Sequence, residues 1–124
     1  MGITHLDITV KRLPSDPAGE ILEFRVDTGA TYTLAPADVL TRPGIQPHRS
    51  LTVTLADGST TSRPMGGAYF EYQGVGGVAP VRFGQSGDAN FLGATALEAM
   101  GMMIDPLSRN LRQRPAMLAR VSIP

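Results

Sequence analysis

The sequence predicts a mainly β protein, a small closed barrel of largely antiparallel strands with one or two short helices. Short alternating or β-branched runs recur along its 124 residues; in the clearest, Leu51, Val53 and Leu55 share one face of a strand. The 14 glycines and 10 prolines are spread through the chain, which is typical of short strands joined by turns rather than of a helical bundle. Helical periodicity is short: Leu97 and Met100 lie three residues apart, just before a glycine.

The first half of the chain predicts three strands and one short helix. A cluster of turn-forming residues at 14–19 separates the first two strands, so we expect a hairpin that ends at Asp27. Proline suits the first position of a helix, where its missing N–H would have no partner, so Pro36 is expected to start the helix. In chain order, the expected elements are strands 3–10, 20–26 and 31–34 and the helix 36–40.

The second half predicts further strands, a hairpin turn and one helix. Asp57 and Gly58 stand between two strand-like runs, which is a strong short-range signal for a hairpin. Residues 73–77 are expected to form another turn and residues 84–88 a loop. Gly101 suits the C-terminal cap of the helix. The expected strands are 51–55, 60–72, 78–83, 91–92, 102–104 and a short one after Leu107.

Composition and charge narrow the classes of function. The chain carries 11 basic and 11 acidic residues, and a net charge of zero gives no support for binding to nucleic acid or a membrane surface. The absence of cysteine excludes disulfides and thiolate metal sites. No run approaches the roughly 18 apolar residues of a membrane span, and residues 1–11 lack a signal-peptide core. We therefore expect one soluble, cytoplasmic domain over residues 1–124, with its core in 1–114 and an extended basic tail over 115–124.

One turn organises the candidate chemistry. A strand-like run ends just before Asp27, which begins a tight turn that continues with Thr28 and Gly29. Taken alone, this triplet is typical of an ordinary turn, because Asp and Gly both favour turns. A second stretch changes the interpretation, because two apolar residues run into Gly93, a helix follows, and Gly101 ends it.

Together the Asp-Thr-Gly-Ala turn at 27–30 and the apolar-apolar-Gly-helix stretch at 90–101 resemble the paired signature of aspartic proteases. The chain is similar to the retroviral-type (retropepsin-like, clan AA) aspartic proteases, in particular to their small bacterial and archaeal branch. Residues 55–58 and 101–106 look like that branch as well, so the resemblance covers nearly the whole chain. It implies a closed small β-barrel of the retropepsin-like acid protease type with a flap hairpin.

The resemblance also implies roles for individual residues. Only one Asp-Thr-Gly turn is present, so the active site requires a homodimer in which Asp27 of each subunit supplies one catalytic carboxylate. The residues that support this site are Thr28, Gly29, Ala30 and Gly93. The flap that closes over substrate has its tip at Ala56, Asp57, Gly58 and Ser59. Gly66-Gly67 is a second candidate for the tip.

The chemistry implied by this arrangement is peptide hydrolysis through a shared proton. Two adjacent carboxylates cannot both ionise, so one takes a proton from a water molecule while the other donates to the peptide carbonyl. We therefore expect a homodimeric aspartic endopeptidase that acts on extended polypeptides. The alternative is a non-catalytic peptide-binding or dimerisation module on the same fold. A third interpretation is an inactive monomer whose Asp27 is never paired.

No cofactor and no metal are expected. His5 and His48 are the only histidines, and neither stands in a carboxylate cluster at metal-ligand spacing. Residues 84–87 lack the order of a nucleophile elbow, and residues 74–77 lack the lysine of a phosphate loop. The expected partners are a second copy of the chain and the polypeptide substrate, with neither nucleic acid nor a membrane involved.

Overall fold

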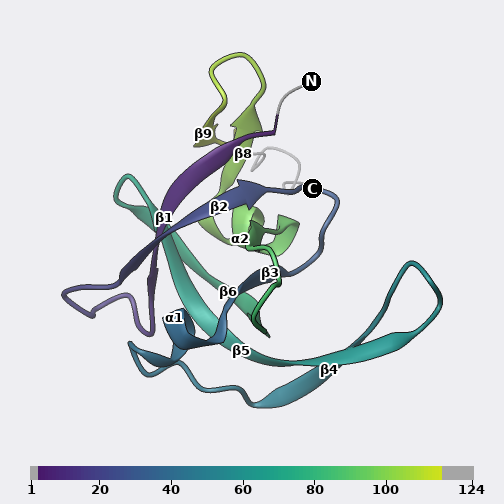
Figure 1. Cartoon of the computed structure of the whole chain (residues 1–124). Helices are drawn as coiled ribbons and strands as arrows, with labels where there is room; N and C mark the ends of the chain where they lie inside the picture. The colour runs from purple at the N-terminus through teal and green to yellow at the C-terminus, as the bar shows by residue number, and fades with distance from the viewer. Residues whose placement is uncertain (1–2, 116–124) are drawn as a thin grey trace, which may run out of the picture.

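The computed structural model describes residues 3–115, and this part of the chain is mainly β. Figure 1 shows strands wrapped around a central core, with hairpins that extend from it at the right and at the top of the view. The strands are β1 (His5–Lys11), β2 (Glu20–Val26), β3 (Thr33–Pro36), β4 (Arg49–Thr54), β5 (Thr60–Tyr72), β6 (Val75–Gly84), β7 (Phe91–Leu92), β8 (Met102–Asp105) and β9 (Asn110–Gln113). The helices are α1 (Ala37–Thr41) and α2 (Ala94–Met100). The predicted tail over 115–124 lies outside the described residues, apart from Pro115.

The main sheet is ring-like. Its strand order is β1-β2-β7-β3-β6-β5-β4, and β5 also pairs with β1, so the sheet returns on itself while β4 stays outside the ring. The closing register pairs Thr9 with Glu71 and Val10 with Phe70. Most pairs are antiparallel as predicted, but β2 runs parallel to β7 and β3 runs parallel to β6. Parallel neighbours need a long crossover connection, which local sequence patterns do not encode.

The core fills the ring. Ile8 and Val10 alternate along β1 and are fully buried, as the two-residue period of a strand allows. Phe24 and Phe70 meet inside the ring in an edge-to-face contact, with centroids 6.3 Å apart. Helix α2 adds apolar side chains such as Leu97. Each large apolar side chain buried in this way stabilises the fold by about 1.5–3 kcal/mol, so the ring is a firm support for the turn that follows β2.

Several predicted elements are confirmed, including the hairpins that join β1 to β2 and β4 to β5. The third strand, however, begins at Thr33 rather than at residue 31. The Thr31 carbonyl accepts hydrogen bonds from the amide and the hydroxyl of Thr95 (3.0 and 2.7 Å). Thr31 is therefore bonded to helix α2 instead of to a neighbouring strand. The first helix begins at Ala37, because Pro36 keeps an extended backbone and occupies the N-cap.

Residues 73–77, which the sequence predicts as one long turn, are divided in the structure between a short turn and strand β6. Only Gln73 and Gly74 form the turn, and both have positive φ angles, as a two-residue hairpin connection requires. Gly76 and Gly77 already belong to β6. A Cβ on Gly76 would overlap a side chain of β5, and one on Gly77 would overlap the backbone of α2. These two glycines therefore permit close packing rather than a change of direction.

The hairpin of β4 and β5 projects from the ring (Figure 1). β5 is continuous over 13 residues, so it runs from the hairpin turn into the ring without a break. Gly66 and Gly67 lie inside this strand, paired with Val81 and Pro80 of β6. The alternative flap tip at Gly66-Gly67 is therefore wrong, because a strand paired on β6 cannot also be a free turn.

Candidate active site

Asp27 lies where β2 leaves the ring. Its amide donates a hydrogen bond to the carbonyl oxygen of Leu92 (2.9 Å), which continues the parallel pairing of β2 with β7 by one residue. The Val26 amide donates to the Thr4 carbonyl on the other side (2.8 Å). Two neighbouring segments therefore hold the backbone that carries the carboxylate.

The turn itself orients the carboxylate. The Gly29 amide donates to Asp27 Oδ1 (3.1 Å), and the Ala30 amide donates to the Asp27 carbonyl (3.2 Å). The aspartate thus stabilises its own turn, as short acidic side chains commonly do. A Cβ at Gly29 would lie 3.4 Å from Oδ1, which is an ordinary contact. Within one chain, crowding by a Cβ is therefore not what requires glycine at this position.

Gly93, from the second half of the chain, lies against the segment that follows the turn. A Cβ at Gly93 would lie 2.6 Å from the carbonyl carbon of Tyr32 and 3.0 Å from the Ala30 oxygen, so no side chain fits. The Gly93 amide donates to the hydroxyl of Thr33 (3.0 Å), a fully buried polar residue. The next amide, that of Ala94, donates to the Ala30 carbonyl (2.7 Å). The start of α2 is therefore bonded directly to the segment that follows Asp27.

A pocket of about 670 Å³ opens beside the Asp27 turn. Asp27 and Thr28 line it from the turn, and the side chain of Asp27 is 39% exposed. The remaining lining residues are Ile3, Thr4, Arg25, Val26, Ile104, Pro106 and Arg109. They come from the N-terminal segment, the end of β2 and the hairpin of β8 and β9. The carboxylate is therefore open to another molecule on the side that faces these segments.

Arg25 is the nearest charged neighbour of Asp27. Its Nη2 lies 3.7 Å from Asp27 Oδ2, and both side chains are 39% exposed, so solvent weakens the pair. The guanidinium carbon of Arg25 also lies 5.8 Å from the centroid of the Phe91 ring, a cation–π contact. Arg25 therefore both lines the pocket and contacts a side chain of β7.

The predicted flap residues lie at the hairpin turn between β4 and β5, away from this pocket. Asp57 accepts hydrogen bonds from the Ser59 hydroxyl (2.5 Å) and amide (2.9 Å), and the pKa of Asp57 is lowered by them, the hydroxyl having the larger effect. Gly58 has a φ of 88°, which favours glycine. Ala56 is exposed like these three residues. None of the four is among the described residues that line the Asp27 pocket.

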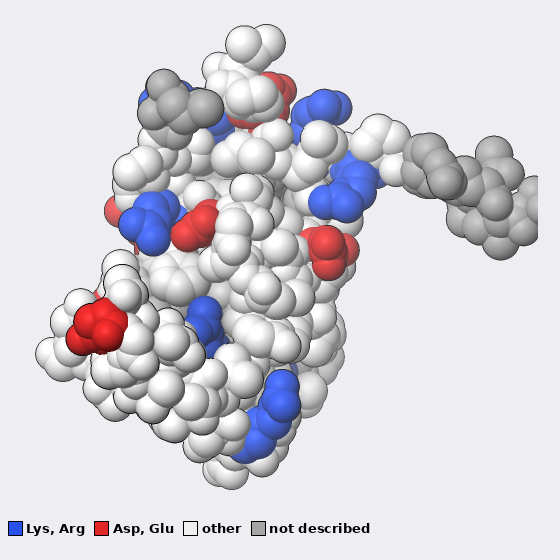
Figure 2. All heavy atoms as spheres, turned by 90° about the vertical axis from the view of Figure 1, so that its right-hand side faces the viewer, with Lys and Arg blue, Asp and Glu red and all other residues white. Residues whose placement is uncertain are grey.

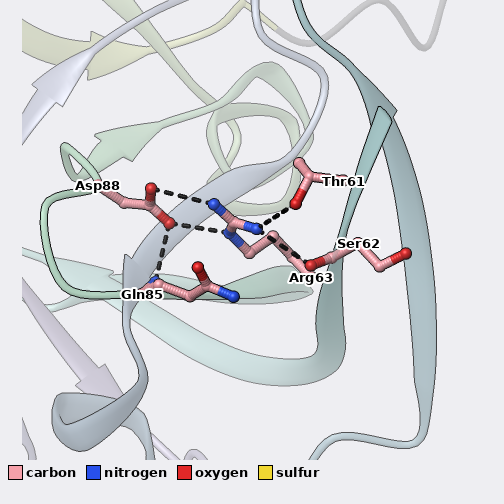
Figure 3. Close-up of polar contacts among 5 residues, drawn as sticks. All are labelled: Thr61, Ser62, Arg63, Gln85 and Asp88. Carbon is pink, nitrogen blue, oxygen red and sulfur yellow. Dashed lines mark hydrogen bonds and ion pairs between the residues drawn. The ribbon is translucent and has the colours of Figure 1, made fainter. Parts of the chain in front are cut away.

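An ion pair anchors the projecting hairpin to the ring (Figure 3). On β5, Arg63 donates from Nε and Nη2 to the two carboxylate oxygens of Asp88, at 2.9 and 3.2 Å. Asp88 Oδ2 also accepts from the Gln85 amide (2.8 Å), and Arg63 Nη1 donates to the Thr61 hydroxyl (2.8 Å). The Arg63 hydrogen bonds are the main reason that the pKa of Asp88 is lowered, and those bonds raise the pKa of Arg63. The pair links the arm of the hairpin to the loop between β6 and β7.

Sequence reasoning missed Arg25, Arg63 and Asp88. A signal for Arg25 is present, because residues two apart in a strand share a face and Arg25 precedes Asp27 by two. Arg63 and Asp88 carry no such local signal, since they belong to segments that meet only in the folded chain.

The comparisons and the surface add little to the local geometry. Neither a scan against protein-family models nor a search of curated proteins gave a match.

Among residues 3–115, no group of three or more His, Cys, Asp or Glu side chains is arranged to hold a metal ion. Neither described helix is long and apolar enough to cross a membrane. Figure 2 shows basic and acidic side chains interspersed on the face toward which the β4–β5 hairpin projects, without a large field of one sign.

Proposed function

We propose that the chain is one subunit of a homodimeric aspartic endopeptidase of the retropepsin-like class, which hydrolyses peptide bonds in extended polypeptides. One observation carries the proposal: Asp27 is held by β7 and by its own turn, yet its side chain remains 39% exposed beside a pocket. The ring-like sheet, the projecting hairpin and the contact of Gly93 with the turn all support a barrel of the retropepsin type.

A second copy of the chain completes the site in this proposal. One carboxylate cannot act as both acid and base at once, and a two-fold axis beside the turn brings Asp27 of each subunit together. Two exposed apolar side chains belong to the segments that form the pocket: Ile3 lines it and is 62% exposed, and Leu107 follows the lining Pro106 in sequence and is 94% exposed. Burial of such side chains against a partner favours association.

The chemistry follows from the paired carboxylates. Two carboxylates in contact share one proton, and the pair titrates as a unit. The ionised member takes a proton from water, which attacks the peptide carbonyl while the protonated member donates to the carbonyl oxygen. The Gly29 amide bonds Asp27 Oδ1, and because each carboxylate oxygen has two lone pairs, the carboxylate can still accept the water and meet the partner carboxylate. The hairpin of β4 and β5 closes over the substrate and excludes bulk water.

One observation favours a second candidate, a non-catalytic peptide-binding or dimerisation module. Arg25 gives Asp27 Oδ2 a partner inside its own chain at 3.7 Å. If that ion pair persists in the dimer, Asp27 is a structural residue and the groove binds peptide without cleaving it.

The experiment that separates the two candidates is cleavage of an unbiased peptide library by wild type and Asp27→Asn across pH, with sedimentation to establish the dimer. Asparagine keeps the size and an acceptor oxygen but cannot ionise, so we expect cleavage to vanish while the dimer and the fold persist. Asp38→Asn, at a side chain that is 76% exposed on α1, is the matched control and should cleave like wild type. Equal cleavage by wild type and Asp27→Asn would exclude Asp27 as the catalyst. A well-folded wild-type dimer that cleaves nothing would favour the binding module.

A further inference from the structure

Arg82 is a half-buried cation without a carboxylate partner in the described structure. It lies on β6 between Val81 and Phe83, which are buried in the core, so Arg82 lies on the opposite face of the strand. None of the ion pairs among residues 3–115 includes it. Its Nε is a buried polar atom with no hydrogen-bond partner in this part of the chain.

The position of Arg82 connects it to the Asp27 pocket. Its guanidinium carbon lies 5.8 Å from the centroid of the Phe91 ring, the same ring that Arg25 contacts at 5.8 Å. Arg25 lines the pocket and pairs with Asp27. Phe91 precedes Leu92, whose carbonyl holds the Asp27 amide. Arg82 is not among the residues that line the pocket, but it shares the ring of Phe91 with Arg25, which does, and so it lies at the edge of the candidate active site.

The surroundings of Arg82 disfavour a cation. Burial is the main cause that lowers the pKa of Arg82, and the nearby charge of Arg63 lowers it further. Tyr32 and, to a smaller extent, Asp88 act in the opposite direction without restoring the usual pKa of Arg82. Both carboxylate oxygens of Asp88 already accept hydrogen bonds from Arg63. An incompletely bonded guanidinium in such a place destabilises the fold relative to an apolar side chain of similar length. A residue that is unfavourable for folding at the edge of a candidate site suggests a role in binding.

We propose that Arg82 forms a subsite for an acidic side chain, Asp or Glu, carried by the bound polypeptide within a few residues of the cleaved bond. The inference rests on the proposed function and specifies its substrate class. A guanidinium binds a carboxylate through two parallel hydrogen bonds, which a lysine cannot reproduce. The ring of Phe91 supplies an apolar wall beside the subsite, and an incoming carboxylate gives Arg82 a counter-charge that no ion pair among residues 3–115 supplies.

The test compares cleavage of peptides that carry Asp or Glu with matched peptides that carry Asn or Gln, by wild type, Arg82→Met and Arg82→Lys. We expect wild type to prefer the acidic peptides at one subsite by about tenfold or more, the scale of one charge-assisted pair. Arg82→Met should lose that preference while cleaving the neutral peptides normally, and Arg82→Lys should keep only part of it. Arg12→Met, at an exposed arginine outside these contacts, is the control and should behave like wild type.

Thermal unfolding of the same variants separates binding from a structural role. Because Arg82 forms no ion pair in the part of the chain that the structure describes, and its removal relieves repulsion from Arg63, Arg82→Met should have a Tm equal to or above that of wild type. A lowered Tm with equal loss of activity toward acidic and neutral peptides would assign Arg82 a structural role and overturn the inference. Wild-type cleavage with no acidic preference would also overturn it, while leaving the proposed function intact. If wild type cleaves nothing, the proposed function fails, and direct binding of the acidic and neutral peptides to wild type and Arg82→Met decides the inference.

Discussion

The amide of Asp27 donates a 2.9 Å hydrogen bond to the carbonyl oxygen of Leu92, so the candidate catalytic residue is positioned by a strand far along the chain. The next residue after Leu92 is Gly93, whose missing side chain lets the start of α2 approach the same turn. The position of the carboxylate therefore depends on the packing of β7 and α2 as much as on the Asp-Thr-Gly turn itself.

Gly93→Ala should damage both stability and activity. The added Cβ would lie 2.6 Å from the Tyr32 carbonyl carbon, and neither backbone segment can move without breaking the hydrogen bonds of the turn. We expect a loss of about 1–3 kcal/mol in the free energy of unfolding, measured by urea denaturation, and a larger relative loss in kcat/KM. Gly67→Ala is the control, because a Cβ there meets nothing within 4 Å. Equal effects of the two substitutions would contradict the role given to Gly93.

Mixing wild type with Asp27→Asn tests whether one site is built from two chains. When equal amounts exchange subunits, about a quarter of the dimers keep two Asp27 residues, so wild-type activity should fall to about half. Asp38→Asn added in the same way should not inhibit, because its dimers keep both Asp27 carboxylates. Activity that is unaffected by Asp27→Asn under conditions of proven exchange would place the whole site within one chain.

Asp57→Ala tests the turn of the projecting hairpin. The substitution removes the acceptor for the Ser59 amide and hydroxyl at an exposed tip, so the free energy of unfolding should stay close to that of wild type. Turnover should fall, because a disordered tip closes poorly over substrate. Asp16→Ala removes a comparable turn acceptor, that of the Leu13 amide, and should leave the kinetics unchanged. Identical kinetics for wild type and Asp57→Ala would show that the tip takes no part in catalysis.

Asp88→Asn should destabilise the protein in a pH-dependent way. The pKa of Asp88 is lowered in the fold, mainly by the Arg63 hydrogen bonds. A lowered pKa means that Asp88 stabilises the fold above its unfolded value of about 3.9, and that this contribution is lost as pH falls through the folded value. Urea denaturation should therefore show a loss of about 1 kcal/mol in the free energy of unfolding at neutral pH, vanishing in acid.

The control for this prediction is Asp38→Asn, since its pair with Arg42 is largely exposed and solvent screens it. Its stability should follow that of wild type at every pH. If the free energy of unfolding of Asp88→Asn stayed below that of wild type at acid pH, the loss of stability would come from disturbed packing around the new amide rather than from the loss of the charge.

Local patterns predicted the elements that are stabilised by near neighbours. The second strand and the residues of β7 were predicted with the observed bounds, and Gly101 ends α2 in a left-handed conformation as expected. The turn at Asp57-Gly58 also forms where its sequence indicates. The prediction failed at residues 73–77, because a glycine needed for packing looks the same in sequence as one needed for a turn.

The sequence by itself determined the order of the strands along the chain and the approximate place of most of them, that Asp27 follows one of them in a tight turn, and that a glycine precedes the second helix. Only the tertiary structure decided the closure of the ring through β1 and β5, the parallel pairing of β2 with β7, and the meeting of Arg25 and Arg82 at Phe91. The reason is physical: turns and strand periodicity depend on residues a few positions apart, whereas ring closure and side-chain encounters depend on burying segments that are remote in the chain.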